Sequence, residues 1–171
     1  IICLERNKFD WGNACNQTEK WLKNDHSKMY GEWNYRWIKP KVIIEECLID
    51  ENGDLPKDYK FFCFNGKVKF IQVDFDRFTD HTRLLFDINF KVLKVGLCYP
   101  RFEGKFVPPK NLSKMIRTAE LLSKNEQFIR VDLYDLGHKI IFGELTLFPG
   151  AGLEKFSPNN FDLELGKENT K

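Results

Sequence analysis

The chain has 171 residues, which is enough for one domain with a sizeable hydrophobic core. Its 27 basic and 25 acidic residues leave a formal net charge of +2 and are mixed along the sequence, which argues against nucleic acid or an anionic membrane surface as the main partner. No apolar run is long enough for a membrane span, and the five cysteines, odd in number and without a CxxC pair, indicate a reducing cytoplasm rather than a disulfide scaffold or a zinc site.

The first third of the chain predicts one helix and one strand. Residues 13–24 (NACNQTEKWLKN) favour a short helix with Asn13 as its N-cap, and residues 30–40 are aromatic and irregular. Residues 41–50 (KVIIEECLID) contain β-branched residues followed by two glutamates, which is typical of a strand. Because the sequence opens on IICLERNK without a methionine, we expect it to be an excised piece of a longer protein.

The middle of the chain contains the clearest local pattern. Residues 58–76 (DYKFFCFNGKVKFIQVDFD) form two β-prone runs joined by Asn65-Gly66, the preferred pair for a type I′ hairpin turn. Residues 111–124 (NLSKMIRTAELLSK) place five apolar side chains on one helical face: Leu112, Met115, Ile116, Ala119 and Leu122. Successive hairpins and few helices predict an α+β fold, with an antiparallel sheet and helices packed on one face.

A second hairpin is predicted from residues 129–135 and 139–147, which flank Gly137. Ile129, Val131 and Leu133 share one face of the first strand, and Ile141, Leu145 and Leu147 share one face of the second. If these faces lie on the same side, a three-residue loop of residues 136–138 sets Asp135 opposite Lys139. Residues 148–166 (FPGAGLEKFSPNNFDLELG) follow as a turn-rich segment.

The predicted register gathers charged side chains on the other face of the second hairpin. Arg130 lies opposite Glu144, Asp132 lies diagonally from Glu144, and Thr146 is one step further along. Spacing alone favours a solvated face with an Arg–carboxylate pair. The alternative is a site for Mg²⁺ and phosphate, because Mg²⁺ prefers oxygen ligands and an arginine can neutralise phosphoryl oxygens.

Several stretches together resemble a known family. RVDLYDLGHKIIFGELTLFPG resembles the C-terminal signature of ATP-grasp enzymes, and DYKFFCFNGKVKFIQVD, FGELT and PGAGLEKFSP are similar to its TupA-like branch, which is named for a teichuronopeptide-biosynthesis protein. The resemblance extends from about YGEWNYRWIKPKVIIEE to DLELG. It implies the C-terminal subdomain of an ATP-grasp fold and the binding of ATP and Mg²⁺.

The resemblance also implies a role for individual residues. It assigns metal binding to Asp132, Glu144 and Thr146, where Thr146 stands in the place of the asparagine found in many ATP-grasp enzymes. It assigns the adenine to Glu45 and to the backbone near Cys47 and Leu48, and the ribose to Asp58. Contacts to phosphate or to a substrate carboxylate fall to Arg130, Arg77 and Arg83, and Gly150 and Gly152 would let the backbone approach the substrate.

The reaction implied by the family is an ATP-dependent ligation of a carboxylate and an amine during synthesis of a cell-surface polysaccharide or polypeptide-glycan. The acceptor would be a carboxylate-bearing glycan or peptide. Residues 1–40 lack the glycine-rich phosphate loop and lysine that precede this region in ATP-grasp proteins. We therefore expect residues 1–171 to be a single domain truncated at its N-terminus and inactive alone, with residues 167–171 as a frayed tail.

Two other functions fit parts of the sequence. A non-catalytic module could bind a glycan or a partner through Trp33, Tyr35 and Trp37, since aromatic rings stack on sugars. A metal-dependent glycosyltransferase, a label often given to this family, would need a DxD motif, and DFD at residues 74–76 has that pattern.

Overall fold

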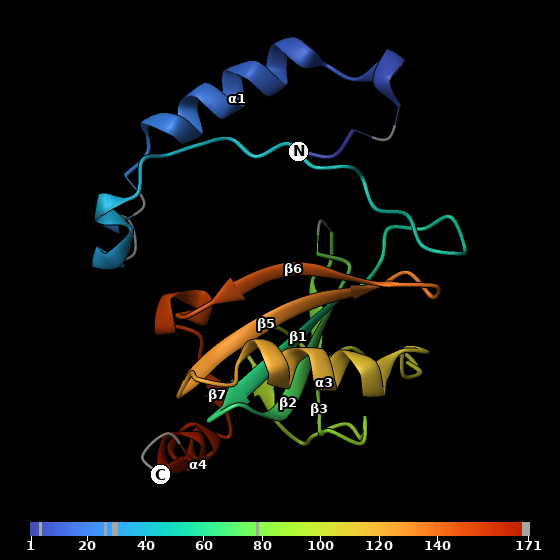
Figure 1. Ribbon diagram of the computed structural model, residues 1–171, viewed down its shortest axis with the longest axis vertical. Coiled ribbons are helices and arrows are strands. Elements are labelled where there is room, and N and C mark those ends of the chain that lie inside the picture. Colours follow the sequence, from blue (N-terminus) through green and yellow to red (C-terminus); the bar gives the residue numbers. More distant parts are fainter. Residues whose placement is uncertain (4, 26, 29–30, 78, 169–171) are drawn as a thin grey trace. The chain divides into compact units, whose positions relative to one another are not determined.

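The structure is a computed structural model that describes residues 1–171 except 4, 26, 29–30, 78 and 169–171 (Figure 1). The chain forms two compact units, Ile1–Leu48 and Ile49–Lys171. In the described part of the chain, no helix combines the length and the apolarity needed to cross a bilayer. The elements in chain order are η1 (Arg6–Lys8), α1 (Trp11–Lys23), η2 (Trp33–Trp37), β1 (Asp58–Phe64), β2 (Lys67–Phe75), β3 (Thr82–Phe86), β4 (Gly96–Leu97), α3 (Leu112–Leu122), β5 (Phe128–Asp135), β6 (Ile140–Thr146), η3 (Pro149–Gly152), β7 (Phe156–Ser157) and α4 (Asn160–Glu168).

The N-terminal unit contains the predicted helix, but the helix starts at residue 11, before the predicted start at residue 13. Helix α1 begins at Trp11, and its N-cap is Asp10, whose carboxylate accepts a hydrogen bond of 2.9 Å from the backbone N–H of Asn13. An aspartate satisfies a free N–H group at the first turn and also favours the positive end of the helix dipole. Asn13 therefore lies inside the helix rather than at its cap.

The strand predicted at residues 41–50 is wrong. This segment has no regular secondary structure, and Ile43 and Ile44 expose 80% and 88% of their surface. A strand needs a neighbour to pair its backbone groups, and the described residues of the N-terminal unit contain helices only. The β-branched run therefore has the composition of a strand, but no other strand in the described part of its unit is present to pair with it.

The second unit is built on a five-stranded antiparallel sheet with the order β3-β2-β1-β5-β6. The predicted α+β class and antiparallel sheet are confirmed. The hairpin of β1 and β2 turns at Asn65-Gly66 as predicted, and both residues have positive φ angles, of 50° and 73°. Those angles are the ones that a type I′ turn requires.

The two faces of the sheet are covered differently (Figure 1). Helix α3 packs on the first face with Met115 and Ala119 buried, whereas Leu122, predicted on the same apolar stripe, is 41% exposed. The second face is covered at one end by β4, β7 and α4, through a cluster that includes Phe70 and Phe161. The other end of the second face has charged side chains.

The hairpin of β5 and β6 differs from the predicted register. Its loop has four residues, 136–139, so Asp135 pairs with Ile140 rather than with Lys139. Further along, Arg130 pairs with Thr146 rather than with Glu144. The pairing shifts by one residue between Val131 and Leu133, which is a β-bulge. Beyond the bulge, Leu145 and Thr146 of β6 lie on the faces that the sequence predicted.

Gly143 lies in the bulge. A Cβ atom there would be 3.0 Å from the carbonyl oxygen of Asp132 and 3.1 Å from the ring of Tyr134. Such contacts are closer than side chains normally allow. The glycine thus permits β5 and β6 to approach where the register changes.

The segment after β6 contains more regular structure than predicted. Its turn-rich sequence includes helix α4, which ends at Glu168, and strand β7, which pairs with the distant β4 in a short two-stranded sheet. Of the predicted frayed tail, residues 167 and 168 belong to α4, and residues 169–171 lie outside the described residues. Helix α4 completes the cover over one end of the second face.

Candidate functional site

The second face of the sheet divides into two regions that we name by their side chains. Strand residues alternate between faces, so a charged residue at every second position forms a row. The aromatic half consists of Phe62, Phe64, Phe70, Leu85 and Phe128. The ionic half consists of Asp58, Lys60, Gln72, Asp74, Arg83, Arg130, Asp132, Glu144 and Thr146.

Arg130 is the centre of the ionic half. Its Nε and Nη2 atoms donate to the two carboxylate oxygens of Asp132 at 2.7 and 2.8 Å. Nη2 also donates to Glu144 Oε1 at 2.6 Å and to the hydroxyl oxygen of Thr146 at 3.0 Å. The four side chains therefore do share one face, as the sequence predicted, although the strand register that brings them together is different.

Lys60 connects this cluster to strand β1. It is directly opposite Asp132 in the β1–β5 pairing, and its Nζ atom donates to Asp132 Oδ2 at 2.6 Å and to Asp58 Oδ2 at 2.5 Å. The side chains of Lys60, Asp58 and Asp132 are 7%, 8% and 2% exposed. Charges buried to this extent are stable only when they are paired, so each of the three depends on the others.

The two carboxylates near Arg130 have different electrostatic surroundings. Burial raises the pKa of Asp132, and the hydrogen bonds from Arg130 and the charge of Lys60 oppose this rise only in part. Burial also acts against ionisation of Glu144, but the hydrogen bond from Thr146 and the charge of Arg130 outweigh it and lower the pKa of Glu144. Glu144 is the more exposed group, with 61% of its side chain accessible.

Arg77 and Asp58 lie at the edge of the ionic half. Arg77 donates to Asp58 Oδ2 at 3.1 Å, and 47% of its side chain is exposed. Asp58 Oδ1 is buried and has no hydrogen-bond partner among the described residues. A buried carboxylate oxygen without a donor costs free energy, which indicates that this oxygen has capacity for a ligand hydroxyl or a water.

Arg83 lies in a second group on the same face. Its guanidinium donates to Asp74 at 2.5 Å, to Glu154 at 3.1 Å and to the carbonyl oxygen of Leu97 at 3.2 Å. Only 6% of its side chain is exposed. The structure thus joins Arg83 to Asp74 rather than to Arg130.

The three residues predicted to bind the adenine belong to the N-terminal unit. Glu45 and Cys47 are exposed, Leu48 is half-buried, and none of them is in a strand. Within this unit, the backbone N–H and C=O groups of the segment therefore lack the strand pairing that the prediction had assumed.

Sequence reasoning missed Lys60 and Gln72, and it considered Asp74 only as part of a DxD motif. Lys60 follows Asp58 by two residues, and Asp74 follows Gln72 by two, so the period of the β1–β2 hairpin already placed each pair on one face. Lys60 and Gln72 are also direct cross-strand partners. The missing step was to align β1 with β5, because this pairing of distant segments brings Lys60 to Asp132.

The cluster offers oxygen ligands of the kind that Mg²⁺ prefers. Asp132, Glu144 and Thr146 supply two carboxylates and a hydroxyl around one guanidinium. Among the described residues, no group of three or more His, Cys, Asp or Glu side chains could hold a metal by itself. The donor set nevertheless fits Mg²⁺, which is usually held by one or two carboxylates together with phosphate oxygens.

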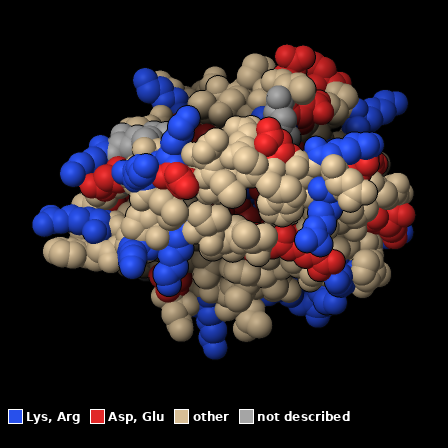
Figure 2. Space-filling model, turned by 90° about the horizontal axis from the view of Figure 1, so that it is seen from above, with Lys and Arg blue, Asp and Glu red and all other residues tan. Residues whose placement is uncertain are grey.

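Charged side chains show no dominant sign on the face of the molecule that Figure 2 shows. On the face shown in Figure 2, Lys and Arg side chains are interspersed with Asp and Glu side chains. This mixture agrees with the formal net charge of +2. A surface of this kind lacks the long-range attraction that concentrated charge exerts on a polyanion.

Comparison with known proteins gave one result. No curated protein and no solved structure matches the chain. The model of a family described as TupA-like ATPgrasp matches residues 1–170, which is nearly the whole chain. The chain is therefore a member of the TupA-like ATP-grasp family.

Proposed function

We propose that this chain takes part in a Mg²⁺-ATP-dependent carboxylate–amine ligation that builds a cell-surface polysaccharide or polypeptide-glycan in the cytoplasm. Family membership supports ATP and Mg²⁺, which ATP-grasp proteins generally use. The observation that carries the proposal is the convergence of Asp132, Glu144 and Thr146 on Arg130. A guanidinium between carboxylates suits the transfer of a phosphoryl group whose charge must be neutralised.

The charges of the ionic half support a metal–triphosphate complex rather than a metal alone. Asp58, Asp132 and Glu144 are matched by three cations, Lys60, Arg77 and Arg130. A cluster with equal numbers of both charges has little attraction for an isolated dication. A Mg²⁺ ion bound to phosphate brings positive charge from the metal and negative charge from the phosphate oxygens. The complex therefore suits a cluster in which both charges are already balanced.

Each residue has a defined role in the proposal. Asp132, Glu144 and Thr146 would hold Mg²⁺, which when bound neutralises the charge of the phosphate oxygens. Lys60 and Arg130 would then turn part of their hydrogen bonding from the carboxylates to the phosphates. Arg77, the most exposed of the three cations, would contact the phosphate or the acceptor carboxylate.

The nucleoside part of ATP has its own candidates. The unpartnered oxygen of Asp58 would accept a hydrogen bond from a ribose hydroxyl. Glu45 and the backbone near Cys47 and Leu48 would contact the adenine, as the family resemblance implies. Arg83 would position Asp74 and Glu154 rather than contact substrate, because its donors are already engaged.

The proposed chemistry has two steps. First, an oxygen of the acceptor carboxylate attacks the γ-phosphorus of ATP, a P–O bond forms, and the bond to the bridging oxygen breaks to release ADP. Second, the amine attacks the carbonyl carbon of the acyl phosphate, a C–N bond forms, and inorganic phosphate leaves with the electron pair of the C–O bond. The amine loses its proton to solvent, and the product is an amide.

Two alternative functions have different support. For a DxD glycosyltransferase, Asp74 and Asp76 would need to reach one metal ion, but Asp74 is buried in β2 and paired with Arg83, whereas Asp76 is exposed and follows the strand with a φ angle of 51°. A glycan-binding module remains a second candidate because Trp33 and Trp37 are 72% and 78% exposed in η2. Calorimetry with oligosaccharides and with Mg²⁺-ATP separates this candidate from the ligase.

The reaction is tested by coupled ADP release by the full-length protein, with uronic acids or glutamyl peptides as acceptors and amino acids as amines. We expect ADP and phosphate only when a carboxylate is present. Arg130→Lys should lower turnover more than ATP affinity, because a planar guanidinium matches the transferring phosphoryl group and a lysine is only a point charge. Sugar transfer from a nucleotide sugar without consumption of ATP would instead establish a glycosyltransferase.

A further inference from the structure

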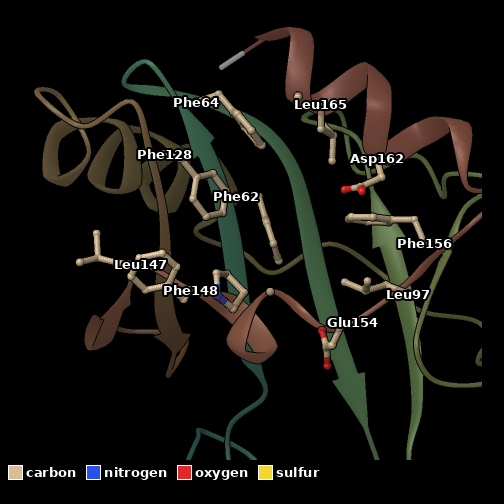
Figure 3. A pocket seen from close by; sticks show the side chains of 13 residues that line it. Phe62, Phe64, Leu97, Phe128, Leu147, Phe148, Glu154, Phe156, Asp162 and Leu165 are labelled. Atoms are coloured by element: carbon tan, nitrogen blue, oxygen red, sulfur yellow. The ribbon is translucent and has the colours of Figure 1, made fainter. Parts of the chain in front are cut away.

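A pocket adjoins the ionic half on the second face of the sheet (Figure 3). It has a volume of about 410 Å³ and lies over the aromatic half, where Phe62, Phe64 and Phe128 form one side. Residues of β4, of α4 and of the segment after β6 form the rest of its lining, among them Leu97, Asp162 and Phe148. A cavity of this size, with aromatic walls and few polar groups, is typical of a small-molecule site.

The strand pairing places this pocket beside Arg130. Phe62 is the direct cross-strand partner of Arg130, and Phe128 precedes Arg130 by two residues on the same face of β5. On β6, Leu147 of the lining follows Thr146, whose hydroxyl accepts a hydrogen bond from Arg130. The lining of the pocket therefore reaches the residues around Arg130, the proposed site of phosphoryl transfer.

The charged groups of the lining are all acidic. They are Glu154 and Asp162, and the described lining contains no lysine or arginine. The charge of Glu154 is balanced by Arg83 at 3.1 Å. Asp162 is exposed to solvent in the first turn of α4, and in Figure 3 its carboxylate points from the helix into the pocket, next to Phe156.

We infer that this pocket binds the amine substrate, and that this substrate is a primary amine with an apolar body of about the size of an aromatic ring. The inference rests on the proposed ligation, for which it supplies the class of nucleophile. An ammonium group is attracted by the Asp162 carboxylate and by the faces of aromatic rings. A carboxylate ligand would be repelled by Asp162, so the acceptor carboxylate belongs on the Arg130 and Arg77 side.

The test measures binding to the full chain without ATP or Mg²⁺. Fluorine NMR follows three probes that share one ring: 2-(4-fluorophenyl)ethylamine, 3-(4-fluorophenyl)propionate and the uncharged 4-ethylfluorobenzene. The inference predicts that the amine binds more tightly than the anion and than the neutral probe. It is overturned if the amine does not bind, or if either of the other probes binds as tightly.

Variants locate the site. Asp162→Asn should weaken binding of the amine by about 3- to 10-fold, the effect of one ion pair near a surface. Asp54→Asn, a matched change at an exposed aspartate outside the pocket, should leave it unchanged. Equal affinities of the Asp162→Asn variant and the unmodified chain would contradict the role of this carboxylate.

A second variant fills the pocket. Gly166 is in the lining, and a Cβ atom added there meets no atom within 4 Å, so Gly166→Leu has room to enter the cavity from helix α4. We expect the affinity for the amine to fall at least 10-fold, in a variant whose proton–nitrogen correlation spectrum shows that the chain is still folded. If this variant does not fold, Phe148→Ala, at a wall residue that is 47% exposed, should give a similar loss. Unchanged binding in the folded variant would place the amine elsewhere.

The outcomes keep the pocket and the ligase separate. If the amine binds as described but the full-length protein releases no ADP with any acceptor, the pocket stands and the proposed ligation fails. If ADP release depends on carboxylate and amine while the binding experiment fails, the ligation stands and the pocket assignment is wrong.

Discussion

The aromatic half and the ionic half lie on the same face of the same strands, yet they are stabilised in different ways. Phe62 and Lys60 are two residues apart on β1, and both are less than 10% exposed. Phe62 stacks on Phe70 with ring centroids 4.2 Å apart, whereas Lys60 pairs with Asp58 and Asp132. Apolar contacts are non-directional, so neighbours can adjust to a change, but a buried charge depends on particular partners.

This difference indicates where the sheet can bind a charged ligand. The aromatic half is covered by apolar groups of α4 and β7, which leave a pocket beside Phe62. Around Arg130, the ionic half and the adjoining Arg77 supply three carboxylates, Asp58, Asp132 and Glu144, and three cations that can exchange partners with a ligand of both signs. The boundary between the halves, at Phe62 and Arg130, is where an apolar and a charged part of one substrate could meet.

The largest expected loss comes from the aromatic half. Phe70 is 1% exposed and contacts the rings of Phe62, Phe156 and Phe161. Phe70→Ala should lower the free energy of unfolding by about 4 kcal/mol, through lost burial and the cavity that remains. Urea denaturation measures this change, with Phe142→Ala, at a residue 53% exposed, as the control. Similar losses in both variants would show that the aromatic half is not a core.

A slightly smaller loss is expected when one cation is removed from the ionic half. Lys60→Met keeps the length of the side chain but leaves Asp58 and Asp132 without their shared partner. We expect a loss of about 3 kcal/mol by urea denaturation, because an uncompensated buried charge is costly. Lys94→Met, at an exposed position, should change stability by less than about 0.5 kcal/mol. A Lys60→Met variant as stable as the control would mean that these carboxylates are not held by Lys60.

A matched pair of glycine changes tests the bulge next to the ionic half. Gly143→Ala should lower the free energy of unfolding by about 1–2 kcal/mol, since its Cβ would crowd Asp132 and Tyr134. Gly166→Ala in helix α4 has open space and should raise stability by about 0.5–1 kcal/mol. Both changes add one Cβ atom. If thermal melting shows that the two variants shift the melting temperature in the same direction, the close approach of β5 and β6 at Gly143 is refuted.

The smallest effect is the pH dependence of Glu144. Its pKa is lowered in the folded chain, so its contribution to stability is present above the ordinary glutamate pKa and is lost as the pH falls through the folded value. Because the side chain is 61% exposed, this contribution should be at most about 0.5 kcal/mol. Glu144→Gln should flatten the fall in stability below pH 5, measured by urea denaturation, whereas Phe70→Ala should not change its slope. Parallel curves for Glu144→Gln and the unmodified chain would contradict this ion pair.

Local patterns predicted the parts of the fold that depend on short-range geometry. Asn65-Gly66 fixed one hairpin, and alternation placed Arg130, Asp132 and Glu144 on one face. The bulge at Gly143 was not predictable from alternation, because one extra residue changes the register without changing the composition of the strand.

The remaining errors involve pairing between distant segments. Lys60 was missed because its partner Asp132 is 72 residues away, and residues 41–50 had β propensity without a partner inside their unit. Helix α4 is held through Phe161 and Leu165, which pack on the aromatic half. Its packing outweighed a sequence rich in turn residues.

The most direct test of the account is calorimetry of the full-length protein with a non-hydrolysable ATP analogue, in the presence and in the absence of Mg²⁺. The balanced charges of the ionic half predict no heat from Mg²⁺ alone, and binding of the analogue that is strengthened by Mg²⁺. Glu144→Gln should weaken the Mg²⁺-dependent binding by about 3- to 10-fold, while Glu126→Gln, at an exposed residue before β5, should not. Equal binding of the analogue with Mg²⁺ and with a chelator, or an unchanged affinity in Glu144→Gln, would contradict the proposed nucleotide site.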